Sequence, residues 1–154
     1  MLPHKHFVYG IVFSLILAII MPQIGFTGVL LIILSTVALD ADHYIYYIYK
    51  KQDLSLIHAY KFFRNIRKKV LSLPYKKRDE YHGPWCFLHG LEVLVILFFL
   101  TIFVSDYIGF VFIGVAFHLL LDYIEQWPLS KRKDRISSAY DFLKFRKLRD
   151  INEI

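Results

Sequence analysis

The sequence predicts an all-α, polytopic membrane protein: a four-helix transmembrane bundle with cytoplasmic amphipathic helices. Hydrophobic residues make up 56% of the 154 residues and fall mainly in four runs that contain almost no charge. All 19 Lys and Arg residues lie outside these runs. Two further segments repeat apolar residues at helical spacing among basic ones. The length suits one domain, so residues 1–154 are expected to form a single membrane unit.

The four apolar runs have nearly the length that a membrane-crossing helix requires, roughly 17–25 residues. Several runs reach it only when the Tyr, His or Asp residues at one end are included, which places those polar groups near the lipid headgroups. A buried hairpin of a soluble protein is one alternative; an N-terminal signal peptide is another, disfavoured because no small-residue cleavage site follows. The predicted transmembrane helices cover residues 6–22, 24–42, 85–104 and 107–124.

The basic residues predict the orientation of these helices. Lys5, the ten basic residues from Lys50 to Arg78 and the eight from Lys131 to Arg149 would share one side of the membrane. The turns on the other side contain none. The positive-inside rule therefore places both termini in the cytoplasm, with the protein in the inner or plasma membrane. The net charge of +6 favours anionic lipid as a partner over nucleic acid, because the basic residues lie within reach of the bilayer.

Two cytoplasmic segments, residues 55–73 and 138–150, are predicted to be interfacial basic helices. The first repeats apolar residues three and four apart, the spacing of one helical face, and basic amphipathic helices of this kind lie flat at the headgroup level. The alternative is that both helices pack on each other. The side chains expected to bind lipid headgroups are Lys61, Arg64, Lys68, Lys76 and Arg78.

Potential metal ligands recur at the cytoplasmic ends of all four runs. An ionisable residue inside a membrane helix costs on the order of 2.5–3.5 kcal/mol by insertion scales, so such residues are usually functional. His118 and Asp122 are four residues apart and His89 and Glu92 three apart, so each pair is expected to share a helical face. A polar clasp between helices is the alternative for any single pair. The predicted ligands are His6, Asp40, Asp42, His89, His118 and Asp122.

Imidazole and carboxylate ligands suit zinc, which is expected, with manganese or iron as alternatives, and the absence of thiolates argues against a purely structural zinc site. Six ligands exceed the needs of one tetrahedral ion, so one to three ions are expected and two are favoured. His4, His43 and His82 are possible further ligands or substrate contacts. Asp42 or Glu92 is the expected catalytic carboxylate, acting as general base on water activated by the metal.

Four motifs give the sequence a family resemblance: residues 6–10 (HFVYG), 40–43 (DADH), 88–92 (LHGLE) and 117–122 (FHLLLD). In this order they resemble the small membrane-bound, predicted metal-dependent hydrolases of bacteria and archaea, and more distantly the zinc-dependent phospholipase C-type enzymes. The resemblance implies a hydrolase and does not identify its substrate. The expected reaction is attack of metal-activated water on a phosphoester or related ester bond. An anionic phospholipid or other phosphorylated amphiphile is the expected substrate, because the basic segments would attract its headgroup. A metal-ion transporter and a non-catalytic scaffold with a metal staple are the alternatives.

Overall fold

The computed structural model describes residues 3–127 and 136–153, which form a mostly helical chain. Residues 128–135, which include four of the basic residues counted in the sequence, lie outside the described part. The α-helices are α1 (Pro3–Ile20), α2 (Gly25–Ala38), α3 (Ala41–Lys51), α4 (Leu56–Ser72), α5 (Leu91–Phe103), α6 (Asp106–Gln126) and α7 (Ser138–Phe145). The short elements are three 3₁₀ helices (Pro22–Ile24, Tyr75–Glu80 and Ile151–Glu153) and the strands β1 (Tyr81–His82) and β2 (Arg149–Asp150).

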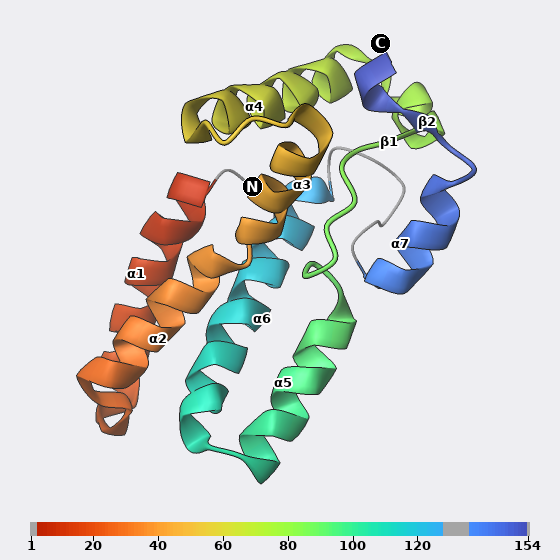
Figure 1. The fold of residues 1–154 in the computed structure, drawn as a ribbon. Helices are drawn as coiled ribbons and strands as arrows, with labels where there is room; N and C mark the ends of the chain where they lie inside the picture. Colours follow the sequence, from red (N-terminus) through yellow and green to blue (C-terminus); the bar gives the residue numbers. More distant parts are fainter. Residues whose placement is uncertain (1–2, 128–135, 154) are drawn as a thin grey trace.

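The lower part of the molecule is a bundle in which α2 packs between α1 and α6, and α5 packs on α6 (Figure 1). Three helical segments are long and apolar enough to cross a membrane: Pro3–Ile20, the combined Pro22–Lys51 and Asp106–Gln126. With 13 residues, α5 is about 20 Å long, short of the hydrocarbon core. Among the described residues, three of the four predicted transmembrane helices thus have the length and composition to cross a membrane.

The third predicted helix begins later than expected, at Leu91 and not at residue 85. Residues 83–90 form a loop because Trp85 and Phe87 bond to the chain near α7, and the Leu91 N–H donates to Ile136 O at 2.9 Å. His89 therefore precedes the helix. The prediction that His89 and Glu92 share a helical face is wrong.

The second predicted helix, residues 24–42, is interrupted at its polar end. Helix α2 ends at Ala38, residues 39–40 form a turn, and α3 begins at Ala41. The turn is closed by tight backbone bonds: the Asp40 N–H donates to Val37 O at 3.1 Å and the His43 N–H to Asp40 O at 3.1 Å. Asp40 lies in the turn and Asp42 in the first turn of α3, and their carboxylates approach opposite ring nitrogens of His89: Asp40 lies 3.9 Å from Nε2 and Asp42 2.9 Å from Nδ1.

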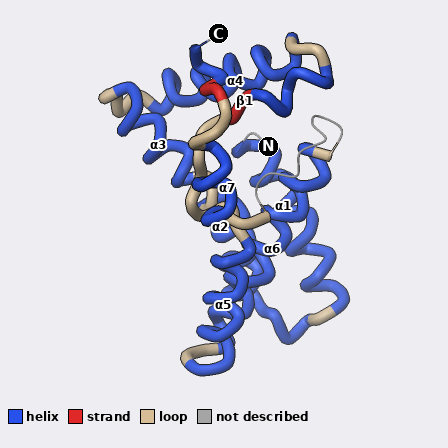
Figure 2. The backbone as a smooth tube through the Cα atoms, turned by 90° about the vertical axis from the view of Figure 1, so that its right-hand side faces the viewer, coloured by secondary structure: helices blue, strands red, loops and turns tan. Residues whose placement is uncertain are grey.

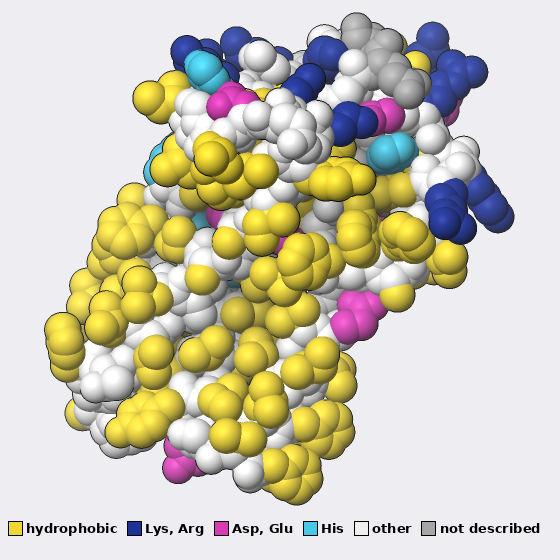
Figure 3. All heavy atoms as spheres, in the orientation of Figure 1, with side chains coloured by type: hydrophobic (Ala, Val, Ile, Leu, Met, Phe, Trp, Pro, Cys, Tyr) yellow, Lys and Arg dark blue, Asp and Glu magenta, His cyan; other side chains and the backbone are white. Residues whose placement is uncertain are grey.

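A polar layer made of α3, α4, α7 and the two short strands covers one end of the bundle (Figures 1 and 2). The predicted helix at residues 55–73 is observed as α4, with the Ser55 side chain accepting from the His58 N–H. Dark blue Lys and Arg atoms occur only around this end of the face shown in Figure 3, and yellow hydrophobic atoms predominate over the rest of it, with a few carboxylates. Basic charge and apolar surface are thus segregated along the bundle.

The predicted helix at residues 138–150 is too long, because α7 ends at Phe145. After a turn, Arg149 and Asp150 pair in parallel with Tyr81 and His82. This reversal of the chain buries Ile151, which is 1% exposed, next to α4. The free energy gained by burying Ile151 outweighs the free energy that a longer α7 would gain from its amphipathic repeat. The helix begins at Ser138, as predicted, and is capped by the preceding Ser137, whose side chain accepts the Tyr140 N–H.

Two charged contacts meet at Glu125 on α6, and the one with Arg67 ties the polar layer to the bundle. Arg67 on α4 lies 2.9 Å from a carboxylate oxygen of Glu125, and Lys5 on α1 lies 3.9 Å from the other. Glu125 is three residues beyond Asp122 on α6. The basic helix α4 is therefore anchored above the cluster of histidines and aspartates described below.

Asp53 joins α3 to α4 and should make stability depend on pH. Its carboxylate accepts from Tyr47 Oη at 2.5 Å, the Ser55 N–H at 2.9 Å and His58 Nδ1 at 2.9 Å. The Tyr47 hydrogen bond is the main cause that lowers the pKa of Asp53 to about 2. A carboxyl group whose pKa is lower in the folded than in the unfolded state stabilises the fold at pH values above its unfolded pKa, which is roughly 4. We expect this stabilisation to be lost as pH falls from about 4 to about 2.

The measurement is the melting temperature of the wild type and of Asp53→Asn between neutral and acid pH. The variant should melt lower at neutral pH, and the difference should close towards pH 2, the lowered pKa. A difference that stays constant through this range would contradict the assignment.

A candidate metal centre of three histidines and two aspartates

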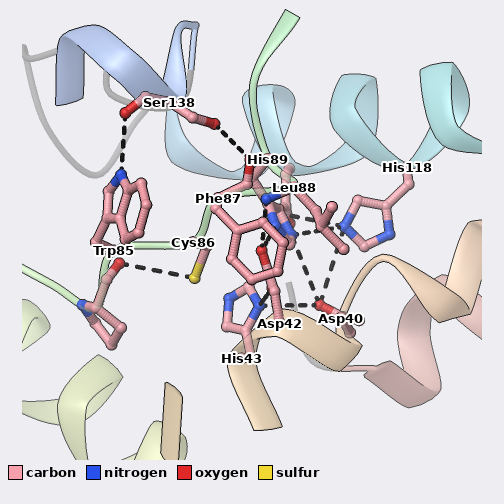
Figure 4. A network of polar contacts seen from close by, with 12 residues as sticks. Asp40, Asp42, His43, Trp85, Cys86, Phe87, Leu88, His89, His118 and Ser138 are labelled. Atoms are coloured by element: carbon pink, nitrogen blue, oxygen red, sulfur yellow. Dashed lines mark hydrogen bonds and ion pairs between the residues drawn. The ribbon is translucent and has the colours of Figure 1, made fainter. Parts of the chain in front are cut away.

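Five ionisable side chains meet where the bundle joins the polar layer, and Figure 4 shows three of them with their neighbours. They come from four separate segments: α1, the turn between α2 and α3, the loop before α5, and α6. Exposed fractions range from 0% to 7%, so the cluster is enclosed. We call it the five-residue centre, and its members are His6, Asp40, His89, His118 and Asp122.

The Nε2 atoms of the three histidines point into the centre together with carboxylate oxygens of both aspartates. The two Nε2 atoms of His89 and His118 are 3.0 Å apart. Asp122 has one oxygen 3.3 Å from His6 Nε2 and the other 3.6 Å from His89 Nε2 and 3.8 Å from His118 Nε2. Asp40 Oδ1 is 3.9 Å from both His89 Nε2 and His118 Nε2.

In His118 and His89 the hydrogen bond made by Nδ1 determines whether Nε2 carries a proton or a lone pair. His118 Nδ1 lies 2.7 Å from Thr36 O, a carbonyl that can only accept, so Nδ1 holds the proton. His89 Nδ1 lies 2.9 Å from Asp42 Oδ2, which also receives the Leu88 N–H at 3.0 Å. In the neutral rings both Nε2 atoms then carry lone pairs that face each other. Such a pair is repulsive unless a cation lies between them.

The environment of His6 favours a metal ion over a proton as the cation in the centre. Its ring stacks on His118 with centroids 3.8 Å apart and is fully buried. Within the described residues neither of its ring nitrogens has a hydrogen bond. A buried polar group without a partner is costly, and a proton held between His89 and His118 would leave this cost in place. A metal ion bound by Nε2 would remove the cost at that nitrogen, although not at Nδ1.

The separations between donors also fit a metal ion. Ligands held about 2.0–2.2 Å from one ion lie roughly 2.9–3.4 Å apart, depending on geometry. The His89–His118 and His6–Asp122 separations of 3.0 and 3.3 Å fall in this range, and the remaining ones, up to 4.0 Å, are slightly wider. Because Asp40, Asp42 and Asp122 are all buried and all lie within 4 Å of His89 ring nitrogens, a cation would also relieve the repulsion between carboxylates.

Small residues on α1, α2 and α6 let these helices pack closely enough for the donor atoms of the centre to meet. The backbone of α6 at Gly114 lies directly against α2, where a Cβ would be 2.5 Å from Ile32 O. Thr36 Oγ1 donates to Ile32 O at 2.7 Å and approaches Gly114 O at 3.3 Å. On the other side a Cβ at Gly10 of α1 would be 3.2 Å from the Thr36 side chain. This close contact, typical of membrane helices, brings Thr36 O within reach of His118.

A second group of potential ligands adjoins the centre. Donor atoms of Asp42, His43, Cys86 and His89 lie within 4.8 Å of one another. Asp42 bonds to both imidazoles, with Oδ1 2.8 Å from His43 Nδ1 and Oδ2 2.9 Å from His89 Nδ1. Asp42 therefore acts as the outer partner that orients His89, an arrangement common behind metal-bound histidines.

The structure places several predicted site residues elsewhere. Glu92 accepts from Ser137 Oγ at 2.5 Å and the Ser138 N–H at 3.1 Å, so its carboxylate serves the start of α7. His82 stacks on Phe145 with ring centroids 4.9 Å apart. His4 is exposed, and its ring centroid is 6.2 Å from that of Tyr60. None of these three belongs to the ligand groups found in the described residues.

The predicted headgroup-binding residues divide into two sets. The Arg78 guanidinium donates to Leu73 O and Leu71 O, each at 3.0 Å, and so satisfies carbonyls at the end of α4. The remaining four side chains are exposed: Lys61, Arg64, Lys68 and Lys76.

Sequence reasoning did not identify Thr36, Arg67 or Glu125. Thr36 acts through its backbone carbonyl, which no side-chain pattern reveals. Glu125 follows Asp122 by three residues, a spacing that could have indicated a second acid on the same face of α6. Comparisons with family models, curated proteins and solved structures found no match to this chain.

Proposed function

We propose that this chain is a membrane-embedded, metal-dependent hydrolase whose centre is formed by His6, Asp40, His89, His118 and Asp122. The observation that carries the proposal is the meeting of three imidazole Nε2 atoms and two carboxylates in an enclosed site. The proposed substrate is an anionic phospholipid or related phosphorylated amphiphile with a phosphoester or ester bond. The resemblance of the four sequence motifs to membrane-bound hydrolases supports this reaction class.

One ion is proposed in place of the two favoured by counting ligands. The donor triads His6–His118–Asp122 and Asp40–His89–His118 share His118. The Nδ1 atom of His118 is occupied by Thr36 O, so its Nε2 is the single nitrogen available, and it binds one cation. Nitrogen and oxygen ligands without thiolate suit zinc, with manganese or iron as alternatives.

The residues of the chain have distinct proposed roles. A bound divalent cation would supply Lewis acidity towards a phosphoryl or carbonyl oxygen and towards water. Asp42 and Thr36 O hold the rings of His89 and His118 so that their Nε2 atoms face the centre. Asp40 is the most exposed of the five donors, at 7%, and the oxygen that it does not use for the cation is the proposed acceptor of a proton from water. It takes this role in place of Asp42, which bonds to His43 and His89, and of Glu92, which bonds to the start of α7. Substrate is proposed to approach on the side of the turn that carries Asp40.

The orientation and the fourth membrane helix are part of the proposal. With basic residues at the polar layer and none at the turns between α1 and α2 or between α5 and α6, the centre would face the cytoplasm. Helix α5 exposes apolar side chains along most of its length, as expected for a helix in contact with lipid. Its shortness would place the His89 loop inside the membrane boundary.

A non-catalytic metal staple is the second candidate, and the near-complete burial of all five donors favours it. Structural metal sites are closed, whereas catalytic sites keep an open position. A staple would hold α1, α6 and the loop before α5 together without reacting with any substrate.

Metal removal separates the two candidates. We expect purified protein to contain bound zinc, manganese or iron, and chelation to abolish hydrolysis of a fluorescent phospholipid analogue. Helix content should be largely kept, and adding zinc back should restore the activity. If chelation instead unfolds the bundle and no hydrolysis is seen in any metal-loaded form, the staple replaces the hydrolase. A purified protein without metal that does not bind added metal would rule out both.

A further inference from the structure

Helix α7 carries an unusual outer surface for a segment in the polar layer. Tyr140 is 60% exposed, Leu143 61% and Phe142 43%, so three large apolar side chains face outward from eight residues. The Trp85 ring lies 5.2 Å from Phe142 and 6.3 Å from Phe87, which is itself 44% exposed. We call these five side chains the tail patch. They form one aromatic and apolar surface built from two segments of the chain.

Basic side chains border the tail patch at the end of α7. Lys144 Nζ lies 5.4 Å from the centre of the Tyr140 ring, and the Arg146 guanidinium 5.1 Å from that of Phe142. Lys147 follows and is exposed. Aromatic rings with cations on one edge match the boundary of a bilayer, where Trp and Tyr occupy the interface and Lys and Arg meet anionic headgroups.

The tail patch is fixed to the bundle by hydrogen bonds. Glu92, in the first turn of α5, accepts from Ser137 Oγ at 2.5 Å, the Ser138 N–H at 3.1 Å and the Ala139 N–H at 3.3 Å. Trp85 Nε1 donates to Ser138 O at 3.0 Å. Ser138 also makes a side-chain bond to Phe87 O. These bonds set the height of α7 relative to α5.

That height coincides with the end of the apolar bundle. Both views of the backbone place α7 beside the upper end of α5 (Figures 1 and 2). Helix α5 exposes apolar side chains from its first residue, since Leu91 is 51% exposed. The apolar surface thus continues from α5 onto the tail patch, and the basic residues begin beyond it.

We propose that the tail patch docks into the headgroup region of an anionic lipid leaflet. The aromatic and aliphatic side chains would enter the interface, and Lys144, Arg146 and Lys147 would bind the lipid phosphates. This inference goes beyond the proposed reaction and does not depend on metal or on hydrolysis. It makes α7 a membrane-contacting element beside the loop that carries His89.

Depth measurement with spin labels tests this docking. Full-length Cys86→Ser protein carries a label at Leu143→Cys in the tail patch or, as the matched control, at Asn65→Cys on the exposed, polar side of α4. The protein is reconstituted in nanodiscs of phosphatidylcholine with about 30% phosphatidylglycerol, or of phosphatidylcholine alone. Collision of the label with oxygen, which dissolves in lipid, is compared with collision with a water-soluble nickel chelate.

In anionic nanodiscs the label at position 143 should collide mainly with oxygen, and the label at position 65 mainly with nickel. The variant Lys144→Gln/Arg146→Gln/Lys147→Gln should make the label at position 143 more accessible to nickel and remove its dependence on anionic lipid. Equal nickel access at both positions in anionic nanodiscs would overturn the proposal. Shielding from both reagents with dipolar coupling between labels would also overturn it, since a second copy of the chain would then cover the patch.

Discussion

His118→Ala is expected to abolish high-affinity metal binding. Its Nε2 belongs to both donor triads, and its Nδ1 is fixed by Thr36 O. Loss of an outer partner typically lowers metal affinity about 10–100-fold, and removal of a direct ligand should cost more than that. Asp42→Asn, which changes the partner of His89 and leaves the five donors in place, should fall within the smaller range. The measurement is zinc affinity by competition with a fluorescent chelator.

Two controls separate ligand loss from misfolding. Asp122→Asn keeps the shape of a donor that contacts three imidazoles and should also bind metal weakly, while helix content and elution volume stay as in the wild type. His58→Ala removes an exposed histidine that pairs with Asp53 and should bind metal like the wild type. Wild-type zinc affinity in folded His118→Ala or Asp122→Asn protein would contradict the proposed centre.

The sequence predicted much of this centre because its ligands are His and Asp residues at helical spacing or at the ends of apolar runs. His118 and Asp122 are one helical turn apart on α6, and both are buried facing the other donors as their spacing predicts. His6, Asp40 and His89 were expected at the same end of the bundle because each lies at the end of an apolar run. The structure brings all five together: helical periodicity made His118 and Asp122 predictable, and the position at the ends of apolar runs made the other three predictable.

The parts that were not predicted depend on contacts between distant segments. The start of α5 at Leu91 and the position of Glu92 are set by bonds to Ser137 and Ser138, about 45 residues further along the chain. The end of α7 is set by the pairing of β2 with β1 and the burial of Ile151. Apolar spacing reports only which face of a segment is buried, so it continued both helices past their true ends.

Gly114→Ala is expected to destabilise the fold and weaken metal binding together. Every atom added at this position meets α2: a Cβ would be 2.5 Å from Ile32 O and closer still to the Ser35 hydroxyl. A backbone carbonyl inside a helix cannot move aside, so α2 and α6 must separate. Overpacking of this kind typically costs about 1–3 kcal/mol. The same separation would lengthen the 2.7 Å contact between His118 Nδ1 and Thr36 O and so misplace a ligand.

Gly109→Ala is the matched control, because Gly109 lies on the same helix and receives the same change. There a Cβ would be 3.2 Å from Thr101 Cγ2, a single methyl group at the neighbouring helix, and the gain in helix propensity is up to about 1 kcal/mol for both variants. Unfolding in detergent and zinc affinity, measured side by side, should therefore fall for Gly114→Ala and change little for Gly109→Ala. Equal behaviour of the two variants would mean that the α2–α6 contact at Gly114 does not position His118. In that case the ligands would have to be held by the metal itself, and not by the packing of the helices.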